Sequence, residues 1–83
     1  MEVTEIKRIG PWSVLVKPWP LYDESGPWWD VRVKHQDANG AYWLGWNGKR
    51  FAQGKSLISL AKNPGLTEQV EETLKDWLKQ EEK

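Results

Sequence analysis

The chain has 83 residues, seven of them tryptophan and none cysteine, and its 12 basic and 12 acidic side chains give a formal net charge of zero. This length allows one domain, and the lack of cysteine excludes disulfides and thiolate metal sites. No apolar stretch is long enough to span a membrane, and the first residues lack the apolar core of a signal peptide, so we expect a cytoplasmic protein.

Two strands are predicted in the N-terminal part of the chain, at residues 3–9 and 12–17. The second alternates apolar and polar side chains, which is typical of a half-buried strand. Pro18 is expected to end it, because proline cannot donate to a sheet ladder. Residues 18–27, rich in turn-forming side chains, are then expected to form a loop across one end of the sheet.

A three-stranded meander is predicted next. Its strands are 28–36, 41–46 and 49–52. The pairs Asn39-Gly40 and Asn47-Gly48 separate these strands, and both residue types tolerate positive φ. Each pair therefore predicts a two-residue hairpin turn.

These two turns fix a register, and the register assigns the side chains to two faces. It places Val33 opposite Trp46 and Leu44 opposite Phe51. The first face is apolar and is expected to lie against the core; it carries Val31, Val33, Tyr42, Leu44, Trp46 and Phe51. The second face is polar and basic; it carries Arg32, Lys34, Gln36, Trp43, Gly45, Arg50 and Ala52. In this register Arg32, Lys34 and Arg50 flank Gly45.

The last third of the chain changes to helical periodicity, and helices are predicted at residues 57–62 and 68–80. Ser56 and Thr67 are the expected N-caps. The longer helix has an apolar stripe formed by Leu66, Val70, Leu74, Trp77 and Leu78. The sequence therefore predicts one α+β domain over residues 1–83, with a twisted antiparallel sheet of two N-terminal strands and a meander, covered on one face by two C-terminal helices.

No pattern in the sequence indicates catalysis. A phosphate-binding loop needs four residues between its first glycine and Gly-Lys-Ser, but five separate Gly48 from Gly54. His35 is the only histidine, and no partner is evident that would make it a general base or a metal ligand. We therefore expect no enzyme activity, no metal and no cofactor.

The second face of the meander carries the leading functional hypothesis, a small non-enzymatic module that binds nucleic acid. Bases can stack on tryptophan while arginine and lysine hold phosphates. The residues expected to make these contacts are Arg32, Lys34, Trp43, Lys49 and Arg50. The predicted arrangement is similar in architecture to the sheet-type DNA-binding domains of integrases and plant transcription factors. An inert, solvated face is the alternative to this hypothesis.

Surplus tryptophans support a second hypothesis, a protein–protein interaction module. A core of this size is expected to need fewer than seven tryptophans, which leaves Trp19, Trp28 and Trp43 for the surface. Exposed tryptophan is a frequent hot-spot residue in protein interfaces. The partner in this hypothesis is another protein, as for an adaptor or an inhibitor of a larger machine, or a second copy pairing along the strand at 3–9. A phage-type accessory protein is the kind of protein expected under the first hypothesis, on the grounds of small size and lack of catalytic residues.

Overall fold

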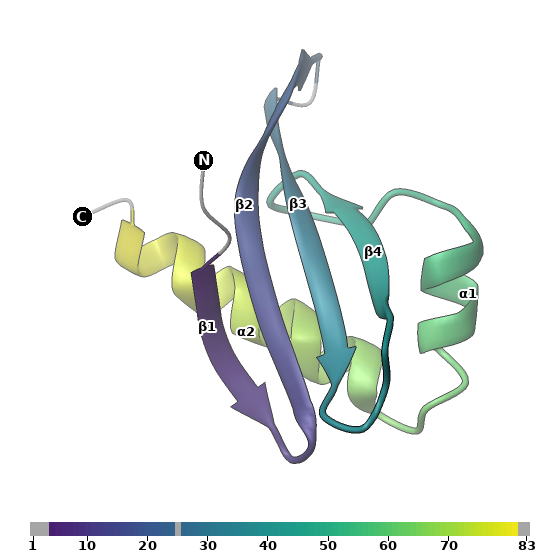
Figure 1. Ribbon diagram of the computed structural model, residues 1–83. Coiled ribbons are helices and arrows are strands. Elements are labelled where there is room, and N and C mark those ends of the chain that lie inside the picture. The colour runs from purple at the N-terminus through teal and green to yellow at the C-terminus, as the bar shows by residue number, and fades with distance from the viewer. Residues whose placement is uncertain (1–3, 25, 82–83) are drawn as a thin grey trace.

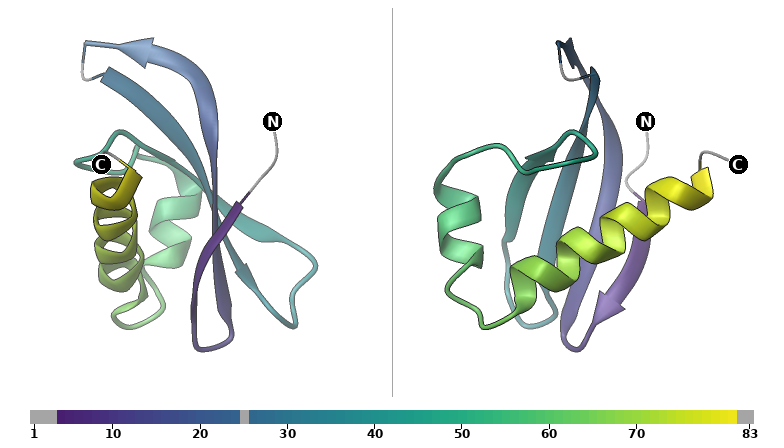
Figure 2. Two further views of the ribbon diagram at one scale, coloured as in Figure 1. Left: turned by 90° about the vertical axis from the view of Figure 1, so that its left-hand side faces the viewer. Right: turned by 180° about the vertical axis from the view of Figure 1, so that it is seen from behind.

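The computed structural model describes residues 4–24 and 26–81, and it shows one antiparallel sheet with two helices packed on the same face (Figures 1 and 2). The strands are β1 (Thr4–Ile9), β2 (Trp12–Asp23), β3 (Gly26–His35) and β4 (Ala41–Trp46), in that order across the sheet, and the helices are α1 (Lys55–Leu60) and α2 (Leu66–Glu81). This architecture confirms the α+β class. Residue 3, predicted to begin the first strand, lies outside the described residues.

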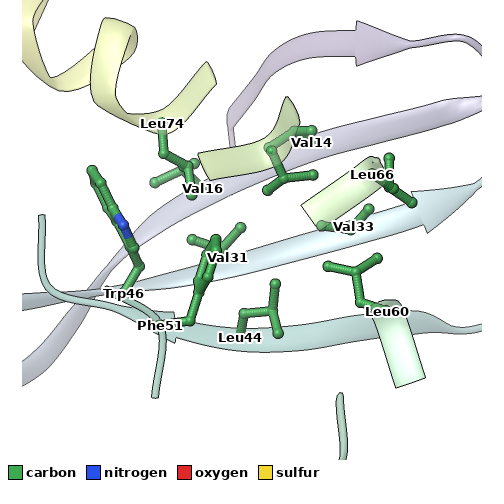
Figure 3. Packing of buried hydrophobic residues seen from close by; sticks show 11 residues of the cluster. Val14, Val16, Val31, Val33, Leu44, Trp46, Phe51, Leu60, Leu66 and Leu74 are labelled. Atoms are coloured by element: carbon green, nitrogen blue, oxygen red, sulfur yellow. The ribbon is translucent and has the colours of Figure 1, made fainter. Parts of the chain in front are cut away.

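The core lies between the sheet and the helices (Figure 3). Alternate residues of β2, β3 and β4 enter it, which confirms the predicted apolar face. Val14, Val31, Val33 and Trp46 are fully shielded from solvent. Each buried aliphatic side chain of this kind contributes about 1.5–3 kcal/mol, so the contact between sheet and helices holds the fold together.

Helix α2 packs through the stripe predicted from its sequence. Leu66, Val70 and Leu74 are buried, and the ring of Trp77 meets that of Trp29 edge to face at 5.1 Å. The predicted cap at Thr67 is wrong, since the helix already begins one residue earlier. Neither helix of the described chain is long and apolar enough to cross a membrane.

Helix α1 begins at Lys55, earlier than predicted, and Ser56 is therefore not its cap. The Ser56 hydroxyl instead accepts the backbone N–H of Trp43 at 3.3 Å. This bond ties the helix to β4, the strand beside it.

The second strand is longer than the sequence indicates. β2 continues beyond Pro18 and pairs with β3 as far as Asp23, so the predicted loop at 18–27 is wrong. The pairing is irregular after Pro18, and no described residue of β1 pairs with β2 beyond Val16. Proline is tolerated there because no described residue pairs with it on the side of β2 away from β3. The hairpin of β2 and β3 projects beyond the other strands (Figure 1).

The turn between β3 and β4 begins at His35, four residues before the predicted Asn39-Gly40 corner. The His35 carbonyl accepts the Ala38 N–H, and its Nδ1 accepts the Asp37 N–H, both at 3.1 Å. Neither Asn39 nor Gly40 has a positive φ. The predicted two-residue turn is therefore wrong, because His35 turns the chain first.

The predicted strand at 49–52 is also wrong. Within the described residues it is reduced to one bridge, between Trp46 and Phe51. The cause is Asn47, whose Oδ1 accepts the N–H groups two and three residues further along, at 3.0 and 2.9 Å. This side-chain turn bends the backbone where a ladder would otherwise continue.

The two wrongly predicted turns change which residues pair across the strands, but they do not change the face of the sheet on which each side chain lies. Val33 pairs with Tyr42 rather than Trp46, and Phe51 lies opposite Trp46 rather than Leu44. The two pairings slip by four and by two residues. An even slip leaves every side chain on its original side of the sheet.

The slip does change which residues are neighbours across the strands. Asp30 now pairs with Gly45, while Lys34 pairs with Ala41 near the end of the hairpin. The position beside Gly45 therefore holds a carboxylate instead of the predicted lysine.

Candidate functional site

The open face is the side of the sheet opposite the core, which neither helix covers (Figure 2). By alternation from the buried valines, it carries Leu15 from β2, Arg32 and Lys34 from β3, and Trp43 and Gly45 from β4. This composition makes it the part of the described chain best suited to meet a ligand.

A concavity of about 390 Å³ lies on the open face. We call it the tryptophan pocket, and its lining includes Trp19, Trp28, Asp30, Trp43, Gly45 and Ala52. Its three tryptophans come from three different strands, β2, β3 and β4. Trp19 is 47% and Trp43 52% exposed, whereas Trp28 is half-buried. The long β2 is essential here, because a strand ending at Pro18 would not deliver Trp19.

Gly45 lies at the bottom of the tryptophan pocket, and its lack of a side chain allows Ala52 and Trp28 to pack closely against it. A Cβ at this position would lie 3.3 Å from the Ala52 Cβ and 3.5 Å from Cε3 of Trp28. Trp28 is further fixed by its Nε1, which donates to Asp23 Oδ2 at 2.7 Å. The half-buried indole is thus held in place against the glycine.

Replacing Gly45 by valine is expected to destabilise the protein by about 1–3 kcal/mol, because the added methyl groups overpack the floor against Ala52 and Trp28. Urea unfolding followed by circular dichroism measures this. Gly40→Val is the matched control, since nothing lies within 4 Å of a Cβ at Gly40 and its φ is not positive. Equal urea concentrations at the midpoint of unfolding for the two variants would show that the residues around Gly45 are not tightly packed.

Asp30 is the one charged residue among the described lining of the pocket, and it is only 3% exposed. Its nearest described cation is Lys17, whose Nζ lies 3.6 Å from Oδ2. At this distance the ammonium group and the carboxylate form an ion pair but no hydrogen bond, and Oδ2 has no hydrogen-bond partner. A buried carboxylate needs both a counter-charge and hydrogen bonds to offset its lost hydration. The charge of Asp30 is therefore compensated only in part, and a cation in the adjoining pocket would add to that compensation.

Trp43 already interacts with one cation on the open face. The guanidinium carbon of Arg32 lies 3.7 Å from the centre of the Trp43 ring, well within cation–π range. The Arg32 Nε is buried without a hydrogen-bond partner. Arg32 is thus held against the ring and supports one wall of the tryptophan pocket.

The structure brings together only part of the residue set predicted for nucleic acid. Arg32, Lys34 and Trp43 line a second concavity, of about 360 Å³. Lys49 and Arg50 are exposed in the turn after β4, at the opposite end of that strand from Lys34. The predicted cluster around Gly45 is therefore divided, because the register that would join its halves does not occur.

Trp19 and Trp28, predicted as partner-binding residues, lie together with Trp43 in the tryptophan pocket. Asp30 and Lys17 were not predicted as residues of the site. Alternation places Asp30 on the open face, but only the true register shows that it is buried next to Gly45. A signal was available in the sequence, since Asp30 lies between Trp29 and Val31 in an otherwise apolar stretch.

His35 lies outside this site. Its ring contacts Trp12 edge to face at 4.8 Å, and its Nδ1 is engaged by the N–H of Asp37. Among residues 4–24 and 26–81, no group of three or more His, Asp or Glu side chains is arranged to hold a metal ion.

No family model, no curated protein and no solved structure matches this chain. The function is therefore argued from the geometry of the open face.

Proposed function

We propose that the chain is a small, non-enzymatic binding module that holds a partner protein through the tryptophan pocket, acting in the cytoplasm. The observation that carries the proposal is the convergence of Trp19, Trp28 and Trp43 from three strands on one concavity. Tryptophans at the centre of a concave surface are typical hot spots, because they bury much area at little entropic cost. No described lysine or arginine lines this pocket, which disfavours a phosphate-bearing ligand.

The edge of the sheet supports a contact through the open face rather than through strand pairing. β1 is an edge strand with an irregularity between Glu5 and Lys7. Glu5, Lys7 and Arg8 are exposed along it. A bulge and charged side chains are the features that disfavour edge-to-edge pairing, so a second copy joined through β1 is not our proposal.

The test begins with immobilised protein and a nuclease-treated cell extract. The retained protein is identified, purified and titrated against wild type and the variants Trp19→Ala and Trp43→Ala by calorimetry. We expect each variant to weaken binding at least ~30-fold, the size of a hot-spot loss. Lys49→Ala is the control, because this exposed residue lies outside the pocket. Unchanged affinity in both tryptophan variants would contradict the proposal.

Nucleic acid is the second candidate ligand, favoured by Arg32 and Lys34 beside the half-exposed ring of Trp43. The same calorimetry with single- and double-stranded oligonucleotides covers it. Binding would then weaken steeply with salt, with a slope of about −0.7 per phosphate contacted on a single strand. It would also depend on Arg32 and Lys34 and be unaffected by Trp19→Ala.

A further inference from the structure

We propose that the tryptophan pocket receives a cationic side chain of the partner, an arginine or a lysine with or without methylation. This inference rests on the proposed function, because it specifies the chemistry of the group that enters the same pocket. It is carried by the placement of three indoles beside the buried carboxylate of Asp30.

The indoles supply the first half of the recognition. The face of an aromatic ring is electronegative, and tryptophan attracts cations more strongly than phenylalanine or tyrosine does. Trp43 already holds the Arg32 guanidinium at 3.7 Å. Trp43 also lines both the tryptophan pocket and the concavity that contains Arg32. The ring therefore stands between a resident cation and the space left for an incoming one.

Asp30 supplies the second half, and it distinguishes a cation from an apolar group. An apolar side chain in the pocket would add nothing to offset the charge of this carboxylate, which is already buried and paired only with Lys17. A guanidinium or ammonium would instead complete the charge compensation that Lys17 provides alone at 3.6 Å. The site thus favours a cation over a neutral group of the same shape.

The dimensions suit one side chain. About 390 Å³ is at the lower end of the range of small-ligand sites, roughly 300–1,000 Å³. Trp19 at the rim is 47% exposed, so a side chain can enter from solvent without a change in the sheet.

The experiment follows the tryptophan indole ¹H–¹⁵N signals of the full chain during titration with four small probes. Two are cationic, the blocked amides of arginine and trimethyllysine. Two are neutral isosteres, the blocked amides of citrulline and norleucine. We expect the cationic probes to shift the indole signals of Trp19, Trp28 and Trp43 with a dissociation constant of about 1–10 mM. The neutral probes should bind at least ~10-fold more weakly, because they bring no positive charge to the buried carboxylate of Asp30.

Asp30→Asn should lower the affinity for the cationic probes about 10-fold and remove the preference over their isosteres. Glu5→Gln is the matched control, since it removes a carboxylate from another part of the open face, outside the pocket. Equal binding of cationic and neutral probes would overturn the inference and leave the proposed function standing. Shifts in none of the three indole signals with any probe would count against both.

Discussion

Trp46→Ala is expected to lower the free energy of unfolding by about 3–5 kcal/mol, a large part of the total, whereas Trp43→Ala, three residues away, is expected to cost only about 0.5–1 kcal/mol. Trp46 is fully shielded within the core, and Trp43 is 52% exposed on the open face. Truncating a buried aromatic side chain costs about 3–5 kcal/mol. A domain of 83 residues has only about 4–12 kcal/mol of stability in total. Urea unfolding monitored by far-ultraviolet circular dichroism measures both variants.

The pair of variants is informative because residue type and strand are the same. Trp43→Ala loses the contact with Arg32 and little else, about 0.5–1 kcal/mol. A similar loss of stability in the two variants would mean that both indoles are buried. That result would remove the open face as it is described above.

Lys17→Met is expected to destabilise the protein by about 3 kcal/mol, because it leaves the buried Asp30 carboxylate without its ion-pair partner. Adding Asp30→Val to this variant should restore stability to within about 1 kcal/mol of wild type. A buried ion pair replaced by apolar side chains of similar size is often neutral or stabilising. Chemical unfolding of the two single variants and the double variant gives the coupling between the residues.

This double variant separates stability from binding. If Asp30 serves a ligand, the Lys17→Met/Asp30→Val protein remains folded but loses its affinity for cationic probes. Asp30→Val alone controls for the change in volume at the floor of the pocket. Additive effects of the two substitutions would contradict the ion pair, and full binding by the double variant would contradict the role of Asp30.

The elements with strong periodicity could be predicted from the sequence. Alternation in β2, β3 and β4 and the stripe on α2 locate the core, because burial of apolar side chains dominates the choice of face. The assignment of side chains to the two faces is correct despite the two wrongly predicted turns, because both register shifts are an even number of residues. The prediction that Pro18 ends the second strand is wrong, because the rule that excludes proline from strands holds only at central, regular positions.

The turns could not be predicted from their Asn-Gly pairs alone. At the first, the ring of His35 competes for the Asp37 N–H and turns the chain early. At the second, the Asn47 side chain accepts two backbone N–H groups. Such side-chain bonds compete with turns of similar free energy, and nothing local in the sequence decides between them.

The candidate site depends on long-range pairing more than the core does. A slip of four residues along β3 exchanges Lys34 for Asp30 beside Gly45, which changes the ligand chemistry from anionic to cationic. The core is insensitive to the same slip, since it requires only an apolar residue at alternate positions.

The most direct test of the tryptophan pocket is therefore the register of β3 on β4, measured by cross-strand nuclear Overhauser effects on labelled protein. Backbone contacts between Asp30 and Gly45, and between Arg32 and Trp43, are predicted. Contacts between Lys34 and Gly45 would contradict this account, because they would put a lysine where the pocket requires a carboxylate.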